Sequence, residues 1–178
     1  QVMDPIGASD TWRWNGYRNS WVMIAGQRIQ SVSGGGHWGG GMWISARDQA
    51  RFGMLSLARG NWAGNQIISE DWVKMARTPG KLNPNYGFMN WTLNTDHKLM
   101  PNAPADSFFH SGAGTNRIWV VPSLNLVVVL RWVGGDHFNG FVDAIDRTRP
   151  VGAVGWHGER YSYLNSLKVA KTSSSYGV

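Results

Sequence analysis

The sequence contains no cysteine, which excludes disulfide bonds, thiolate zinc sites and a cysteine nucleophile. Charged residues make up only 16% of the 178 residues. No apolar stretch approaches the roughly 18 residues that a membrane-spanning helix needs. The longest one, Leu126 to Leu130, has the length of a strand. We therefore expect no membrane span in this chain.

Clustered positive charge is also missing. The 17 Lys and Arg exceed the 11 Asp and Glu and give a net charge of +6. The excess is spread thinly over residues 1–145 and 146–178 without a basic run. A nucleic-acid surface needs clustered cations that displace counterions, so we expect no nucleic acid as a partner.

Several catalytic and cofactor motifs are absent or incomplete. Gly34 to Gly39 matches G-x-G-x-x-G, but it lacks the preceding strand and the following helix that a dinucleotide site needs. The five histidines show no i,i+4 pair and no carboxylates at metal-ligand spacing. The G-x-S-x-G nucleophile motif is absent. The sequence therefore predicts neither a metal site nor a cofactor.

Glycine and tryptophan are abundant, with 23 and 11 residues, and hydrophobic residues reach 42%. This composition is typical of a folded chain rich in turns, with aromatic walls or a tryptophan-rich core. The chain opens on Gln1 without an initiator methionine or signal peptide, so we expect its true N-terminus to be missing.

Helical spacing is clearest from Ser45 to Gly60, with Ser45 as N-cap and Asp48 near the free amides of the first turn. A second helix is predicted from Ser69 to Arg77, and a closing helix over 138–145. The sequence of residues 1–33 predicts loops and short strands. The tail, residues 146–178, is rich in Arg, Gly and Ser, and we expect it to be weakly ordered.

Strand patterns occur at Tyr86 to Thr92, at Phe108 to His110, at Asn116 to Val121 and at Asn125 to Val133. Pro122 to Leu124 forms a short hairpin connection between the last two. The prediction is an α+β fold, in which an antiparallel sheet carries the helices at 45–59 and 138–145 packed on a face.

The segment His110-Ser111-Gly112-Ala113-Gly114 ends a strand and has a specific chemical use. Its side chains can point at a bound carboxylate or carbonyl, while the glycine lets the substrate lie alongside. The next backbone amide can then donate to a developing oxyanion. The simpler interpretation of the pentapeptide alone is an ordinary glycine-containing turn with one exposed histidine.

The stretch Gly39 to Gly53, which contains Ser45-Ala46-Arg47-Asp48 and Ala50-Arg51-Phe52-Gly53, strongly resembles the serine β-lactamase-like hydrolases. This family includes class C β-lactamases, related penicillin-binding proteins and esterases. Asp4 to Thr11 is similar to the family's Pro-Leu-Gly-Met-x-Asp-Thr segment, and His110-Ser111-Gly112 is similar to its Lys-Thr-Gly triad. The resemblance covers residues 4 to 145 and omits the tail.

The resemblance implies that residues 1–145 are the C-terminal portion of a β-lactamase-like domain, namely the α/β part of that fold. His110 would orient a substrate carboxylate or assist proton movement, Ser111 would hydrogen-bond substrate, and Ala113, just past Gly112, would offer its amide to the oxyanion. A family of this kind suggests a bacterial periplasmic or secreted location.

The sequence departs from the family at the nucleophile, because it contains no Ser-x-x-Lys motif. A serine needs a neighbouring base to become nucleophilic. The nucleophile is therefore expected from a missing N-terminal segment of the same protein, and the chain alone should be inactive. Tyr17-Arg18-Asn19 matches Tyr-x-Asn but follows the Pro-Leu-Gly-Met-like segment instead of preceding it, so Tyr17 is predicted to line the site without being catalytic.

The substrate is expected to be a small molecule with an ester, amide or β-lactam bond. Because a histidine is only partly charged at neutral pH, His110 favours esters and amides over penicillins. An aromatic wall for an apolar acyl group is one interpretation of four tryptophans, and core packing is the other: Trp12, Trp14, Trp38 and Trp43. The alternatives in other functional classes are a non-catalytic tryptophan-rich binding module and a catalytically dead β-lactamase-like scaffold.

Overall fold

The computed structural model describes residues 2–31, 41–89 and 91–147. Residues 1–148 form one compact unit, and residues 149–178 form a second unit that lies outside the described residues. The predicted weakly ordered tail from residue 146 therefore lies almost entirely outside them, as does Trp38.

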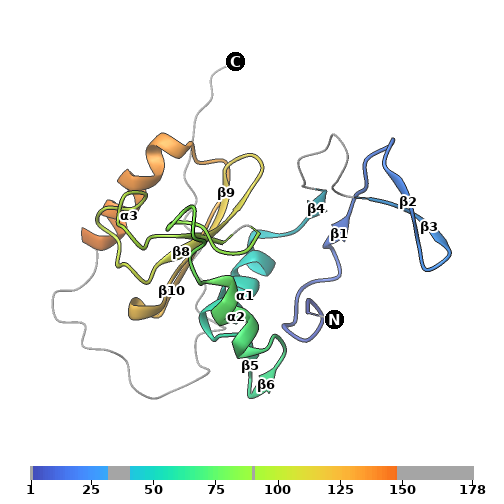
Figure 1. The fold of residues 1–178 in the computed structure, drawn as a ribbon, viewed down its shortest axis with the longest axis horizontal. Coiled ribbons are helices and arrows are strands. Elements are labelled where there is room, and N and C mark those ends of the chain that lie inside the picture. The colour runs from blue at the N-terminus through green and yellow to red at the C-terminus, as the bar shows by residue number, and fades with distance from the viewer. Residues whose placement is uncertain (1, 32–40, 90, 148–178) are drawn as a thin grey trace. The chain divides into compact units, whose positions relative to one another are not determined.

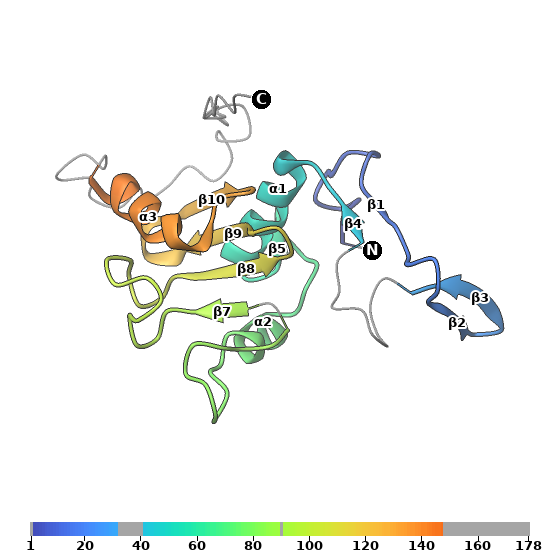
Figure 2. The same cartoon turned by 90° about the horizontal axis from the view of Figure 1, so that it is seen from above.

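A four-stranded antiparallel sheet forms the centre of the first unit, with the strand order β10-β9-β8-β7 (Figures 1 and 2). A 3₁₀ turn at Pro122–Leu124 joins β9 to β10. In the register of β8 and β9, His110 lies opposite Ile118, and Ser111 lies opposite Arg117. The strands are β7 (Trp91–Leu93), β8 (Phe108–Gly112), β9 (Asn116–Val121) and β10 (Leu126–Leu130).

Two predicted strands are shorter in the structure than the sequence pattern suggested. The segment from Tyr86 to Thr92 turns back on itself, since the amide of Trp91 donates to the carbonyl of Phe88 at 2.9 Å. Only Trp91–Leu93 joins the sheet, and Tyr86 meets Thr92 in an isolated bridge. The last strand stops at Leu130 rather than Val133, because Trp132 adopts a left-handed backbone conformation (φ 62).

The helices agree closely with the sequence pattern. They are α1 (Ala46–Leu57), α2 (Glu70–Ala76) and α3 (Phe138–Arg147). The Ser45 hydroxyl accepts from the Asp48 amide at the start of α1, and Ser69 caps α2 in the same way. These caps satisfy amides that have no partner inside the helix.

The helices cover both faces of the sheet. One face contacts α1 and α2 through a cluster that contains Val73, Phe108, Ile118 and Val120, with Phe52 packed against it. The other face contacts α3 through a cluster that contains Phe109, Trp119, Val121, Phe138 and Val142. The expectation that helices 45–59 and 138–145 pack on one face is therefore corrected. Alternating residues along β8 and β9 are apolar on both faces, so each face needs its own cover.

The N-terminal segment forms loops and short strands, as predicted. β1 (Arg13–Trp14) pairs with β4 (Met42–Trp43), and β2 (Trp21–Ile24) forms a hairpin with β3 (Gln27–Gln30). A further small hairpin follows α1 and consists of β5 (Asn61–Trp62) and β6 (Asn65–Gln66).

The buried carboxylate of Asp48 ties this N-terminal segment to α1. It accepts hydrogen bonds from the Ser9 amide (3.0 Å), the Ser9 hydroxyl (2.6 Å), the Ser45 hydroxyl (2.8 Å) and the Arg51 guanidinium (2.8 Å). Burial opposes ionisation, but these hydrogen bonds and the Arg51 charge outweigh it and leave the pKa of Asp48 below its ordinary value. Next to this anchor, Met3, Ile6 and Leu55 form a third buried cluster.

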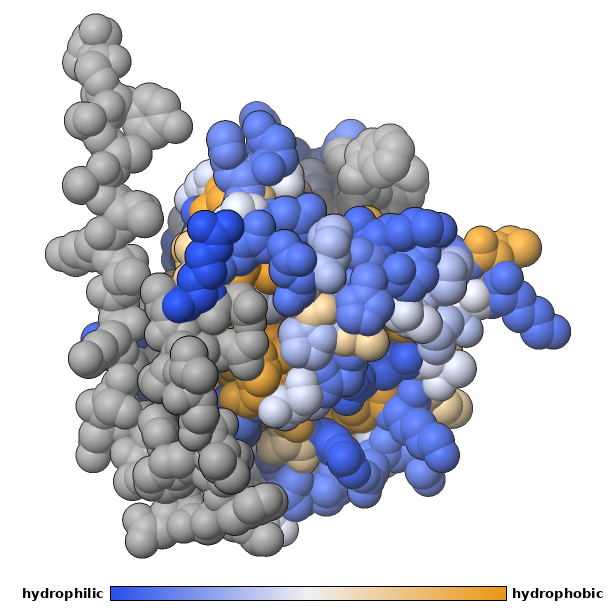
Figure 3. Space-filling view, turned by 90° about the vertical axis from the view of Figure 1, so that its left-hand side faces the viewer, coloured by the Kyte–Doolittle hydropathy of each residue, from blue (hydrophilic) through white to orange (hydrophobic). Residues whose placement is uncertain are grey.

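The described surface is mainly polar on the side shown in Figure 3, with apolar side chains visible between the hydrophilic ones. Within the described residues, no helix is both long and apolar enough to cross a membrane. The first unit is thus a mixed α+β arrangement of helices and small antiparallel sheets.

Candidate functional site

The imidazole of His110 is buried at the middle of β8. It is only 4% exposed and lies on the sheet face that α1 covers. Three aromatic rings surround it at edge-on angles, with ring centroids 4.4 Å away for Trp91, 5.3 Å for Phe52 and 5.7 Å for Phe108. The exposed histidine of the simple-turn interpretation is therefore wrong.

Burial also fixes the charge of His110. Removal from water disfavours the imidazolium and lowers the pKa of His110 to about 4. The partial positive charge expected at neutral pH is therefore absent, and neither imidazole nitrogen faces solvent. A direct ionic contact between this side chain and a substrate carboxylate does not fit the arrangement.

Ser56 on α1 is the hydrogen-bond partner of His110, with 3.1 Å between its hydroxyl oxygen and Nε2. The same hydroxyl donates to the Phe52 carbonyl one turn earlier in the helix. Because a serine has one hydroxyl hydrogen, the oxygen accepts from Nε2–H, and the proton of the neutral ring lies on Nε2. Nδ1 is buried and has no hydrogen-bond partner among the described residues.

The chain leaves the core directly after His110. Ser111, Gly112 and Ala113 are exposed and lead into a tight turn that returns to β9 at Asn116. The Ala113 carbonyl accepts from the Asn116 side chain at 2.6 Å. The described residues provide no acceptor for the Ala113 amide, which lies outside the β8–β9 ladder. An exposed amide on a fixed turn can donate to a ligand oxygen.

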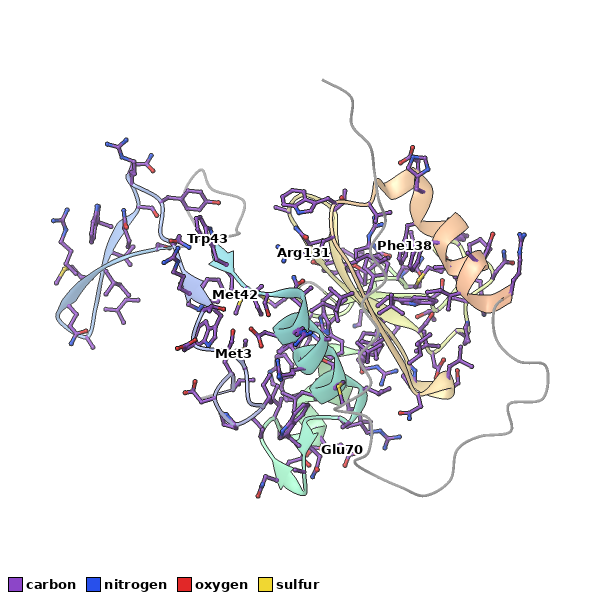
Figure 4. All side chains as sticks on the ribbon, turned by 180° about the vertical axis from the view of Figure 1, so that it is seen from behind. Met3, Met42, Trp43, Glu70, Arg131 and Phe138 are labelled. Atoms are coloured by element: carbon purple, nitrogen blue, oxygen red, sulfur yellow. The ribbon has the colours of Figure 1, made fainter. Side chains whose placement is uncertain are left out.

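A chain of side-chain hydrogen bonds holds this turn in place. Arg131 follows β10 and donates from Nε to the Asn116 side-chain oxygen at 3.3 Å, while Asn116 donates to Ala113. The same guanidinium donates to the Ile44 carbonyl at 3.1 Å, just before α1 (Figure 4). The turn is therefore braced by β10 and by the segment that begins α1.

The other predicted site residues that the structure describes lie in the N-terminal loops and short strands. Tyr17 lies in the loop before β2, where its amide donates to the Ser31 carbonyl at 3.1 Å. Trp14 and Trp43 are exposed on the β1–β4 pair, and Arg13 lies over the Trp43 ring. Trp12 is half-buried against the third cluster, and Trp38 lies outside the described residues. The roles of Tyr17 and Trp38 in lining a site stay predictions.

Sequence reasoning did not identify Ser56, Asn116 or Arg131 as part of the site. A polar Ser56 between Leu55 and Leu57 is the only sequence signal for a buried partner on α1. Asn116 and Arg131 are 15 positions apart and meet only because β9 and β10 are paired. Among the described residues, no group of three or more His, Cys, Asp or Glu side chains is placed to hold a metal ion.

Comparisons with known proteins give little further information. No protein-family model matches the chain, and no curated protein matches it. Among solved structures, the chain is similar to a putative 6-aminohexanoate-dimer hydrolase from Bacillus anthracis, with a TM-score of 0.45 and 22% identity. The match covers 60% of this chain and 29% of that one, so the chain spans less than a third of its length. A likeness at this level establishes neither the family nor the reaction.

Proposed function

We propose that the chain supplies one wall of the active site of a serine hydrolase, including part of the oxyanion hole. The substrate bond is an ester, amide or β-lactam bond, and the reaction passes through an acyl-enzyme. The observation that carries the proposal is the β8–β9 turn, where Ser111, Gly112 and Ala113 leave the core and present an amide for which the described residues provide no acceptor. The β-lactamase-like pattern at Gly39 to Gly53 supports it.

The chemistry needs a donor where negative charge develops. When a serine oxygen attacks a carbonyl carbon, the carbonyl oxygen becomes an oxyanion, and a fixed backbone amide stabilises it. In the proposal the Ala113 amide is one donor, and the Ser111 hydroxyl bonds another polar atom of the substrate. The attacking serine loses its proton to a neighbouring base, and the leaving group departs with a proton. Water then attacks the acyl ester and frees the serine.

The nucleophile is the part that this sequence does not contain. It has no Ser-x-x-Lys motif, and its exposed turn offers Ser111 without a base at hydrogen-bonding distance among the described residues. We therefore place the nucleophile on a further segment of the same protein. The chain alone is then expected to be inactive.

The neutral His110 favours esters and amides over penicillin-type substrates. Binding of a β-lactam carboxylate calls for a permanent positive charge, whereas His110 has a pKa of about 4 and is buried. In the proposed site His110 acts through the backbone of β8, and we treat it as a positioning residue.

The test compares the 178-residue chain with a longer version that carries a Ser-x-x-Lys segment. Both are assayed with a chromogenic short-chain ester and a chromogenic cephalosporin. The proposal predicts ester turnover by the longer version alone, and loss of that turnover when its Ser-x-x-Lys serine becomes alanine. Turnover by the 178-residue chain would contradict the assignment of the nucleophile to another segment.

A second candidate is a non-catalytic binding module, because several indole rings are exposed on the short N-terminal strands. Trp14, Trp21 and Trp43 are 55%, 48% and 59% exposed. Exposed indoles can stack on sugar faces. If neither version turns over the ester or the cephalosporin, and polysaccharide binding is lost in Trp21→Ala, the result would favour this module or a catalytically dead scaffold.

A further inference from the structure

An exposed tryptophan lies beside the proposed oxyanion turn. Trp132 follows β10 and is 72% exposed, which is unusual for so large an apolar side chain. Its backbone is also strained, because its φ of 62 lies in the left-handed region that bulky residues rarely adopt. Strained backbone of this kind occurs often at binding and catalytic sites.

The Trp132 ring packs directly on the turn. A methyl group added to Gly114 would overlap the six-membered part of the indole, so the ring lies against the backbone of the turn. Gly114 is the residue after Ala113, whose amide is the proposed oxyanion donor. The ring therefore lies against the residue that directly follows this amide in the turn.

Trp132 directly follows the residue that braces the turn. Arg131 bonds both Asn116 and the Ile44 carbonyl, and Trp132 is the next residue. Trp132 also differs from two other exposed tryptophans. Arg13 lies over Trp43 at 4.8 Å and Arg28 over Trp21 at 4.5 Å, whereas no described arginine or lysine covers the Trp132 ring. Among the described residues, its exposed surface is therefore open to an apolar group.

We infer that Trp132 is a specificity-determining residue that stacks on an aromatic group next to the substrate carbonyl. The inference rests on the proposed function, since it places the carbonyl oxygen at the Ala113 amide. The inference takes this aromatic group to be joined to the carbonyl by a short linker such as one methylene. The substrate class is therefore an arylacyl ester or amide.

The test uses the longer version, with its Ser-x-x-Lys serine replaced by alanine, and measures binding of two neutral probes, N-methylphenylacetamide and N-methylacetamide. Backbone amide and indole signals are followed by two-dimensional NMR, and the Trp132 indole is assigned by its loss in Trp132→Phe. The aryl probe should bind more tightly than the other, by about 2- to 10-fold, as expected for one aromatic contact. Both probes should shift the Ala113 amide.

Trp132→Ala should remove this preference, and Trp132→Phe should keep most of it. Trp21→Ala is the matched control, because Trp21 is also exposed but lies on β2. An unchanged preference in Trp132→Ala, with the Ala113 amide still shifting, would overturn the inference and leave the carbonyl site standing. A Trp132-dependent preference without any Ala113 shift would support the aromatic contact and contradict the proposed oxyanion site.

Discussion

At the scale of single residues, His110 shows how position changes chemistry. A histidine at a strand end suggests an exposed, partly charged group. In the structure three rings and Ser56 enclose it, and burial keeps it neutral. The pentapeptide identifies the turn that follows but not the face of β8 to which the imidazole points. That face is set by register with β9 and by α1, which lie elsewhere in the sequence.

The burial of His110 predicts a pH-dependent stability. The folded protein holds the pKa of His110 at about 4, while the unfolded chain has the ordinary value of 6.5. Between these values only the unfolded state binds the proton, so the free energy of unfolding falls as the pH drops from 6.5 to 4. The loss amounts to about 3 kcal/mol. Urea titrations at several pH values should show it.

His110→Gln keeps a donor for Ser56 but cannot titrate in this range, so its unfolding free energy should lose this pH dependence. His137→Gln is the control, because His137 is 78% exposed on its side chain. An equal dependence in wild type and His110→Gln would show that His110 does not carry the effect.

Asp48 predicts a large loss of stability on substitution. Its buried carboxylate holds Ser9, Ser45 and Arg51 together, and Asp48→Ala leaves these donors without their acceptor. The expected cost is about 3 kcal/mol in the free energy of unfolding at pH 7. Asp71→Ala, at an exposed position of α2, should cost well under half as much. Denaturant titrations that show equal losses of unfolding free energy in Asp48→Ala and Asp71→Ala would contradict the role of Asp48 as an anchor.

At the scale of elements, sequence patterns predicted the helices better than the strands. Ser45 and Ser69 are caps that act within one turn, so local sequence determines where α1 and α2 begin. Strand ends depend on partners elsewhere in the chain. The turn at Phe88 delays the start of β7, and the left-handed Trp132 ends β10 early; neither has a local signal of comparable strength.

The contact between α1 and the sheet predicts opposite effects for two helical glycines. A Cβ at Gly53 would lie 2.5 Å from the Val127 methyl and 2.7 Å from the Ile118 methyl. Gly53→Ala should therefore destabilise the fold by about 1–3 kcal/mol, despite the better helix propensity of alanine. At Gly140 in α3 a Cβ meets nothing within 4 Å, so Gly140→Ala should stabilise by up to about 1 kcal/mol. Thermal melts of both variants check the pair, and stabilisation by both would show that α1 does not pack this closely.

At the scale of the whole molecule, exposed apolar side chains predict that the chain alone is poorly soluble. All four residues of β2 are exposed, from Val22 at 40% to Met23 at 65%. Apolar patches of this kind mark surfaces that bind other protein. The isolated chain should bind a hydrophobic dye and self-associate as its concentration rises, whereas dilute samples stay dispersed and suit the denaturant and thermal titrations. A monodisperse monomer that melts cooperatively without dye binding would contradict this.

The part of the site that sequence could predict is the His110-to-Ala113 segment, because its motif is contiguous. The brace through Arg131 and Asn116 and the ring of Trp132 come from other strands. Their position depends on the pairing of β9 with β10. Catalysis depends on the proposed further segment that carries the nucleophile. The central claim concerns the Ala113 backbone amide, which is the oxyanion donor that this chain provides.

The most direct test of that claim measures kcat for a chromogenic ester with Ala113 variants of the longer, Ser-x-x-Lys-containing version. Ala113→Pro removes the backbone donor, and Ala113→Gly keeps it. The account predicts that Ala113→Pro lowers kcat by about 10²- to 10³-fold, while Ala113→Gly stays near wild type. Near-equal kcat values for the two variants, with both folded, would contradict the role of the Ala113 amide as an oxyanion donor.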